Sequence, residues 1–213
     1  MKIGIIGASG KVGSLVVKEA VDRGHEVTAI VRNQYKHTEQ KVKVLKKSVF
    51  NLNSEDVKGF DVIINAFGAA PGQEELHVEA GRVLINILEK LPAIRLFVVG
   101  GAGSLFVDEG KTIRLMDTEA FPPEYKATAQ SQGVNLEDLQ KTSTLRWTFI
   151  SPAAFFNPAG KRTGSYKPGK DTVILNSKGL SYVSYADYAI AMLDEIENPK
   201  HVNQRFTVVG EAE

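Results

Sequence analysis

The sequence contains no cysteine and has almost no net charge. Without cysteine the chain has no thiol nucleophile, no all-cysteine zinc site and no disulfide, so any redox chemistry must come from a bound cofactor. The lack of cysteine also fits a reducing compartment, and we expect a cytoplasmic protein. The 26 Lys and Arg residues balance 25 Asp and Glu residues, giving a formal net charge of +1. A surface that tracks phosphates needs an excess of clustered cations, so we expect no nucleic-acid partner.

Long apolar runs are missing as well. The apolar start at residues 3–6 is too short for the core of a signal peptide, and no stretch nears the roughly 18 residues of a membrane span. We therefore expect no membrane partner. The 213 residues are 43% hydrophobic and 24% charged, which is typical of one globular domain. No linker-like change in composition and no internal repeat divides the chain, so we predict a single domain over residues 1–213.

Short β-branched runs alternate with amphipathic stretches in the first half of the chain. Strands are expected at residues 3–6, 27–31, 42–45, 62–65 and 96–99, and helices at residues 11–23 and 74–90. Gly24 is suited to end the first helix, because glycine adopts the left-handed conformation without strain. The alternation favours βαβ units, which predict an α/β fold with a Rossmann-like, doubly wound parallel sheet covered by helices on both faces.

The rest of the chain is less regular. A helix is expected at residues 122–141, a strand in LRWTFISP and a last strand in QRFTVVG, with a Gly- and Pro-rich stretch between the two strands. Ser184 and Asp187 have the spacing of a capping box, which predicts a helix beginning near Ser184 and a structural role for Asp187. We predict a cofactor-binding core at residues 1–150 and a small irregular C-terminal substrate lobe at residues 151–213.

A glycine-rich turn joins the first expected strand to the first expected helix. It has the G-x-x-G-x-x-G spacing and consists of Gly7, Ala8, Ser9, Gly10, Lys11, Val12 and Gly13. Gly7 permits the tight turn, Gly10 lets a pyrophosphate approach the backbone, and Gly13 lets the helix pack closely on the sheet. The helix start adds unpaired N–H groups for the phosphates. This context predicts a dinucleotide site; the alternative is a turn that serves only tight packing.

The end of the second expected strand indicates which cofactor is preferred. The segment VTAIVRN places Arg32 there, with no carboxylate nearby. NAD enzymes use Asp or Glu at this point to bind the adenosine ribose, whereas Arg accommodates the extra phosphate of NADP. Arg32 therefore favours NADP(H) over NAD(H), and Ser9 and Lys11 could contribute to the same pocket; the alternative is that Arg32 is simply solvated. Several lysines also make this edge basic, as is common for solvated faces, namely Lys36, Lys41, Lys43, Lys46 and Lys47.

Four later segments carry a family resemblance: NAFGAAP, VVGGAGSL, WTFISPAAFFNPAGKRTG and YVSYADYAIAMLDEIENPKHVNQRFTV. Together with the glycine turn and Arg32, they make nearly the whole chain resemble the atypical short-chain dehydrogenase/reductases of the NADH-flavin reductase type and, more distantly, the biliverdin reductase B type. The resemblance implies that residues 48–51 border the adenine. It implies further cofactor contacts, which in chain order are Val49, Phe50, Ala66, Phe67, Gly68, Gly100 and Gly101. It also implies that Pro152, Phe155 and Phe156 face the substrate.

The chain lacks the helical Tyr-x-x-x-Lys pair of the larger dehydrogenase superfamily, in which the lysine lowers the pKa of the phenol. Tyr166 and Lys170 have the spacing, but Pro168 would break any helix between them. Tyr125 is followed by Ala129 at the position of the lysine. A carbonyl substrate needs a proton donor, whereas a flavin accepts hydride at N5 and can take its proton from water. The missing pair therefore favours a flavin or quinone-like acceptor.

Further side chains are candidates for the substrate side. Phe155 and Phe156 could form an aromatic platform for an isoalloxazine ring, unless they are ordinary core residues. Ser104 is the candidate catalytic residue, since its hydroxyl could bond the nicotinamide amide or a substrate oxygen; the alternative is an ordinary turn serine. The loop beginning at Pro152 lacks the histidine of biliverdin reductase B-like members, which argues against reduction of linear tetrapyrroles.

No metal site or serine hydrolase is indicated. The histidines have no i, i+4 partner of the metal-ligand type: His25, His37, His77 and His201. No G-x-S-x-G elbow occurs either. The sequence therefore predicts an NAD(P)H-dependent oxidoreductase that passes hydride to a small flavin or quinone-like molecule, as a monomer or a homodimer. The alternatives are a non-catalytic NADP(H)-binding redox sensor or regulator, and an epimerase or dehydratase of the extended family.

Overall fold

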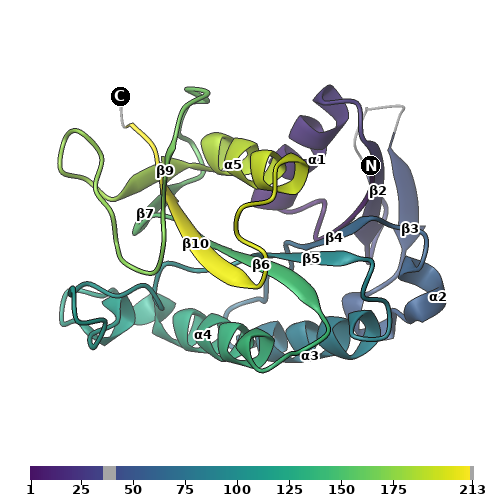
Figure 1. Ribbon diagram of the computed structural model, residues 1–213, viewed down its shortest axis with the longest axis horizontal. Helices are drawn as coiled ribbons and strands as arrows, with labels where there is room; N and C mark the ends of the chain where they lie inside the picture. The colour runs from purple at the N-terminus through teal and green to yellow at the C-terminus, as the bar shows by residue number, and fades with distance from the viewer. Residues whose placement is uncertain (36–41, 212–213) are drawn as a thin grey trace.

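The protein folds around one large, mostly parallel β-sheet (Figure 1). The structure is a computed structural model, and it describes residues 1–35 and 42–211. The strand order is β3-β2-β1-β4-β5-β6-β10-β8, in which the β10–β8 pair is antiparallel and the other pairs are parallel. In chain order these strands are β1 (Lys2–Ile6), β2 (Glu26–Val31), β3 (Lys43–Lys46), β4 (Val62–Asn65), β5 (Arg95–Val99), β6 (Arg146–Ser151), β8 (Lys167–Gly169) and β10 (Gln204–Val209). The predicted Rossmann-like doubly wound sheet is confirmed.

Helices cover both faces of this sheet (Figure 1). On one face α1 (Lys11–Asp22) packs beside α5 (Tyr185–Glu197), and on the other α3 (Leu76–Leu88) packs beside α4 (Lys126–Gln140). Shorter pieces are α2 (Ser54–Val57) and the 3-10 turns η1 (Val49–Asn51), η2 (Leu115–Asp117) and η3 (Pro123–Tyr125). This two-sided cover is what the continuous apolar strand runs predicted. Within the described ranges, no helix combines the length and the apolar character needed to cross a membrane.

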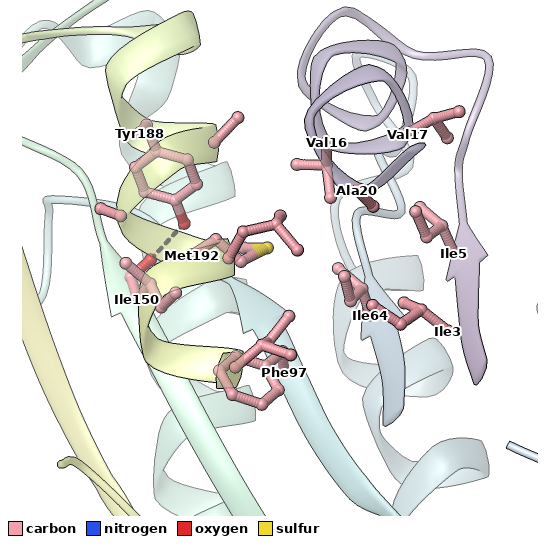
Figure 2. Packing of buried hydrophobic residues seen from close by; sticks show 14 of the residues in the cluster. Ile3, Ile5, Val16, Val17, Ala20, Ile64, Phe97, Ile150, Tyr188 and Met192 are labelled. Atoms are coloured by element: carbon pink, nitrogen blue, oxygen red, sulfur yellow. Dashed lines mark hydrogen bonds between the residues drawn. The ribbon is translucent and has the colours of Figure 1, made fainter. Parts of the chain in front are cut away.

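The side chains of the sheet alternate between two apolar cores, one under each helical layer. In β4, Ile64 belongs to the core with α1 and α5, whereas Ile63 belongs to the core with α3 and α4. Figure 2 shows the first core, where Ile5 of β1 lies near Ala20 of α1 and Ile3 lies near Ile64. Successive strand residues point to opposite faces, so each strand needs apolar side chains at nearly every position. Truncating such a buried isoleucine to alanine typically lowers the free energy of unfolding by about 2–5 kcal/mol. Packing in both cores therefore fixes the position of the strands and of the loops at their ends.

A buried hydrogen bond ties α5 to the sheet. Tyr188 is fully buried, and its hydroxyl donates to the carbonyl oxygen of Ile150 at 2.7 Å (Figure 2). Burial raises the pKa of the Tyr188 phenol well above its ordinary value, so the group stays a neutral donor. The bond anchors α5 over β6, the strand whose carboxyl end leads into the loop at Pro152.

The predicted helix start at Ser184 is confirmed. The Ser184 hydroxyl accepts a hydrogen bond from the N–H of Asp187 at 3.0 Å, which caps α5. The buried Asp187 carboxylate does not return to the capping residue. It accepts instead from the N–H groups of Thr163 and Gly164, both at 2.9 Å. Asp187 therefore has a structural role, since it holds the Gly- and Pro-rich loop against the start of α5.

The C-terminal segments are divided between the main sheet and a smaller unit. β10 pairs with β6 in parallel, and α5 forms the crossover between them. The expected division at residue 150 therefore does not coincide with a break in the sheet. β7 (Phe155–Asn157) and β9 (Tyr182–Ser184) form a separate two-stranded parallel sheet, which is joined to the end of β10 by a hydrogen bond from the N–H of Gly210 to the carbonyl oxygen of Tyr182 at 2.7 Å. A strand of three residues is too short to be predicted from the alternation of apolar and polar residues.

Element ends differ slightly from the predicted ones. The first helix ends at Asp22, and Gly24 follows with a φ of 80°, the left-handed conformation expected of it. The helix expected at residues 122–141 begins with η3, and α4 itself starts at Lys126. Helix ends fray and often tighten into 3-10 turns, so pattern alone places them only approximately.

Candidate cofactor and acceptor cleft

The carboxyl ends of the parallel strands open into a cleft of about 1120 Å³. It lies where the strand order reverses, between β1 and β4, which is where open α/β sheets bind ligands. We call one end the turn end; its lining residues come from the segments 7–13, 47–49 and 66–69 and include Arg32 and His77. The other is the aromatic end, lined from residues 115–132 and 152–158 and by Tyr185. Small-molecule sites measure roughly 300–1000 Å³, so this cleft has room for a dinucleotide and a second small molecule.

The first and last glycines of the turn cannot carry a side chain. Gly7 has a φ of 73°, and a Cβ there would collide with the carbonyl oxygen of Ala66. A Cβ at Gly13 would collide with the carbonyl oxygen of Gly7, a backbone atom that cannot rotate away. Gly10 closes the turn by donating its N–H to the Gly7 carbonyl at 2.9 Å. The mechanical reasons predicted for Gly7 and Gly13 are therefore present in the structure.

The start of α1 presents unsatisfied backbone donors. Gly10 is the N-cap residue, and no described side chain caps the helix. The first helical bond runs from the N–H of Ser14 to the Gly10 carbonyl at 2.9 Å, which leaves the N–H groups of Lys11, Val12 and Gly13 without a helical acceptor. The first turn, which the structure describes completely, contains no acidic side chain. The positive end of the helix dipole is therefore open to an anion, and this cradle fits a diphosphate.

Cationic side chains surround this cradle. Lys11, Arg32 and Lys47 all line the turn end. Arg32 follows β2, is exposed, and makes no hydrogen bond or ion pair with any residue that the structure describes. Lys47 donates to the Asp56 carboxylate at 2.7 Å, and this bond lowers the pKa of Asp56. The sequence pattern indicated a solvated face for Lys47, whereas the structure places this residue in the cleft wall. Two other lysines of the predicted basic edge lie outside the described residues, Lys36 and Lys41.

Residues 66–68 form the wall of the cleft after β4. The side-chain oxygen of Asn65 accepts a hydrogen bond from the N–H of Phe67 at 3.1 Å and so shapes the turn. The Phe50 ring meets the Phe67 ring edge-on, with centroids 5.6 Å apart. Val49 lines the cleft but Phe50 does not. Phe50 therefore supports the wall from behind, because only its neighbour in η1 points into the cleft.

His77 completes the turn end from the start of α3, a role that sequence analysis missed. Its ring packs edge-on against Phe67 at 5.6 Å, and its Nε2 accepts from the N–H of Ala69 at 3.5 Å. Burial lowers the pKa of the His77 imidazole, an effect that the Glu74 carboxylate partly opposes. His77 is therefore a neutral acceptor at pH 7. No sequence pattern near this residue distinguishes it from an ordinary surface histidine.

Two glycines after β5 form the middle of the cleft, Gly100 and Gly101. A Cβ at Gly100 would collide with the ring of Phe149, and a Cβ at Gly101 would collide with the side-chain oxygen of Gln132. Gln132 comes from α4 and lines the cleft as well. Packing therefore requires glycine at both positions, because Phe149 and Gln132 occupy the space that a side chain would need.

Ser104 is not brought into the cleft. It is buried, and both its hydroxyl and its carbonyl oxygen accept hydrogen bonds from the Arg205 guanidinium at 3.0 Å. The same guanidinium donates to the Asp171 carboxylate at 3.0 Å. Ser104 thus anchors the loop after β5 to β10. The expected contact with nicotinamide or substrate does not fit this position, because Ser104 does not line the cleft and its hydroxyl is bound to Arg205.

The two adjacent phenylalanines at the aromatic end differ in environment, although both line the cleft together with Pro152. The Phe156 ring is half-buried, with its centroid 4.0 Å from that of Tyr185 and 4.8 Å from that of Tyr188. Phe155 is 60% exposed. Phe156 is therefore part of the wall, whereas Phe155, whose ring contacts that of Tyr182 at 5.7 Å, leaves most of its surface exposed.

Two tyrosines at this end were missed by sequence analysis as cleft residues. Tyr125, at the end of η3, is 61% exposed and lines the cleft. Tyr185 lines it from the first position of α5. Burial raises the pKa of the Tyr185 phenol, and Tyr125 raises it further. Both residues lie far apart in the chain, so only the fold reveals that they share a site.

Neither a catalytic Tyr-x-x-x-Lys pair nor a metal-binding group is formed by the described residues. Tyr166 donates its hydroxyl to Asp194 at 2.9 Å, and Lys170 follows β8 outside any helix, so the Tyr-x-x-x-Lys spacing here is a chance match as predicted. No group of three side chains suited to hold a metal ion occurs among the described residues. His37 lies outside them.

Comparisons with known proteins agree with this geometry. Residues 7–199 match the family of proteins described as NAD(P)H-binding. YwnB of Bacillus subtilis strain 168 is 69% identical over 213 residues, which is 100% of both chains. The crystal structure of SP1627 from Streptococcus pneumoniae TIGR4, described as a candidate NADH-flavin reductase, has a TM-score of 0.94 and 44% identity, covering 99% of this chain and 100% of that one. A candidate epimerase from Bacteroides thetaiotaomicron has a TM-score of 0.88 and 39% identity, covering 100% and 98%.

These matches extend over both ends of the cleft, not over the glycine turn alone. They support a nicotinamide cofactor and the general class of NAD(P)H-dependent oxidoreduction. The predicted resemblance is confirmed: the chain belongs to the NAD(P)H-binding family of atypical short-chain dehydrogenase/reductases.

Proposed function

We propose that this protein is an NADPH-dependent reductase of a flavin or quinone-like acceptor. The observation that carries the proposal is one cleft that joins a cationic, N–H-lined cradle to an aromatic pocket. The described residues that line this cleft include no Asp or Glu and no helical Tyr-x-x-x-Lys pair. An epimerase or dehydratase would need such acid–base groups at the reacting carbon, so the lining favours an acceptor that needs none.

The turn end accounts for binding of the cofactor. The N–H groups of residues 11–13 would hold the diphosphate, and Arg32 would hold the 2′-phosphate that distinguishes NADPH from NADH. Hydrogen bonds between charged groups contribute about 1.5–3 kcal/mol each, enough to set a preference between the two cofactors. A bound NADPH would supply the hydride.

The aromatic end accounts for the position of the acceptor. Gly100 and Gly101 line the middle of the cleft with backbone alone, and Phe155 and Tyr185 contribute ring surfaces to the same lining. The chain's own contribution is orientation: it holds two flat molecules at reacting distance, roughly 3–3.5 Å, and excludes water between them. The proton that completes reduction comes from solvent, since flavins and quinones accept it without a positioned acid.

Stopped-flow mixing tests this proposal. Protein and NADPH are mixed with FMN, riboflavin or a set of quinones, and NADPH absorbance is followed against a protein-free control. We expect at least one acceptor to accelerate NADPH oxidation with saturation kinetics. Saturable NADPH binding without turnover of any acceptor would reject the reductase and support the redox sensor, because the cradle alone suffices for sensing.

A further inference from the structure

The charges in the cleft are confined to the turn end. Its cationic lining residues, Lys11, Arg32 and Lys47, all belong to that end. The described lining residues of the aromatic end are apolar, aromatic or neutral and polar. Lys126 and Arg162, which are close in sequence to residues of this end, do not line it: Lys126 is exposed at the start of α4, and Arg162 is bound to Glu19 at 3.0 Å. A phosphate or carboxylate on the second ligand would therefore find no counter-ion among the described residues that line this end.

The aromatic end offers ring surfaces that no protein group covers completely. Phe155 and Tyr125 come from different parts of the chain, and each keeps more than half of its surface exposed while lining the cleft. Isolated exposed aromatics are unremarkable, but two in one cleft provide a binding surface for a flat apolar ligand. Phe156 supports this surface from the core side, with its ring against Tyr185 and Tyr188.

Tyr185 adds one directed polar group to this surface. Its hydroxyl makes no hydrogen bond with any described residue, although the side chain is only half-exposed. The ring is held by Phe156 at 4.0 Å, and the backbone is held by the Ser184 cap of α5. Burial raises the pKa of the phenol, so the hydroxyl keeps its proton at neutral pH and can donate it in a hydrogen bond.

We propose that the aromatic end binds an uncharged planar ring that bears a carbonyl oxygen, as quinones and the alloxazine ring do, and that the Tyr185 hydroxyl donates a hydrogen bond to that oxygen. This inference rests on the proposed function. The hydride from NADPH carries two electrons and one proton to the acceptor ring, and solvent delivers the second proton to the reduced acceptor. Tyr185 keeps its own proton throughout, and its hydrogen bond stabilises the charge that develops on the oxygen.

A comparison of riboflavin with FMN tests the charge preference, because the two share one ring and differ by a phosphate. Flavin fluorescence is titrated with protein saturated with NADP⁺, which cannot reduce the flavin. We expect dissociation constants within roughly threefold of each other. A cationic phosphate site would favour FMN by roughly ten- to a hundredfold, so an FMN preference above roughly tenfold would overturn the inference.

Tyr185→Phe tests the hydrogen bond, because it keeps the ring against Phe156 and removes only the hydroxyl. We expect roughly three- to tenfold weaker binding of riboflavin and a similar fall in kcat/KM with a quinone, while NADP⁺ affinity stays unchanged. The matched control is Tyr166→Phe, whose hydroxyl bonds Asp194 outside the cleft; acceptor binding should not change. Unchanged acceptor binding in Tyr185→Phe would remove Tyr185 from the site.

These outcomes separate the inference from the proposed function. If no acceptor is turned over, the reductase proposal fails, yet the riboflavin and FMN titrations still report the charge preference of the pocket. If turnover occurs with a strong FMN preference, the reductase stands and the neutral pocket is wrong. The wild-type titrations need no variant, so a folding defect in Tyr185→Phe, visible in its Tm, would leave the charge preference testable.

Discussion

The turn end and the aromatic end of the cleft are built by different means. At the turn end the backbone sets the shape: Gly7 and Gly13 have no space for a Cβ, and the unsatisfied donors are main-chain N–H groups. At the aromatic end, side chains from segments far apart in the chain converge on one surface, among them Tyr125, Phe155 and Tyr185. We therefore expect substitutions in the turn to weaken cofactor binding and folding stability strongly, and substitutions at the aromatic end to have smaller effects, mainly on acceptor affinity.

The largest effect is expected from Gly13→Ala. The new methyl group would meet the carbonyl oxygen of Gly7, so the turn or the helix must shift. Overpacking of this kind costs about 1–3 kcal/mol of stability, and the displaced N–H groups should weaken NADPH binding by more than roughly tenfold. Thermal unfolding and calorimetric titration measure both. Gly59→Ala is the control, since a Cβ there meets nothing within 4 Å. Wild-type NADPH affinity in Gly13→Ala would show that the backbone does not define this end.

Arg32→Ala should separate the two cofactors. Loss of a charge-assisted hydrogen bond to the 2′-phosphate is worth about 1.5–3 kcal/mol, so NADPH should bind at least roughly tenfold more weakly while NADH binding barely changes. Calorimetry with both cofactors gives the ratio. Lys43→Ala provides a matched control, because Lys43 is an exposed cation of β3 that does not line the cleft. Equal losses for NADPH and NADH would remove the phosphate role from Arg32.

The smallest effect concerns the pH dependence of the wall at His77. Burial lowers the pKa of His77 in the folded state below the ordinary value of about 6.5, so the unfolded chain takes up a proton more readily on acidification. Stability contributed by neutral His77 is therefore lost as pH falls from about 8 to about 5. The Tm of wild type minus that of His77→Gln should decrease over this range. A difference that is constant or grows on acidification would contradict the buried, neutral imidazole.

The fold and the turn end could be predicted because their requirements are local. Residues 2–22 form a strand, a turn and a helix in succession. The backbone atoms that exclude a side chain at Gly13 belong to Gly7 of the same turn, and those that exclude one at Gly7 belong to Ala66, directly after the neighbouring strand β4. The continuous apolar runs of β4 and β5 predict that both faces of these strands are buried. Arg32 could be predicted as a residue near the turn because it stands at a fixed place after β2, and it lines the cleft.

The aromatic end could not be predicted as well, because its contacts are long-range. Ser104 matched an expected position after β5, but its partner Arg205 lies 101 residues further along the chain, and no local pattern indicates that bond. Phe156 looked equivalent to Phe155 until its packing on Tyr185 and Tyr188 was known. The hydrophobic pattern of a segment indicates whether it forms a helix or a strand, but it does not indicate which of its side chains will be covered by other elements.

The most direct test of the cradle is a backbone amide NMR titration with NADP⁺. The account predicts saturable binding in which the largest chemical-shift changes fall on the N–H groups at the start of α1, those of Gly10, Lys11, Val12 and Gly13, with a further change at the Arg32 side chain. Absence of binding, or saturable binding whose largest shifts lie away from α1 and β2, would contradict it.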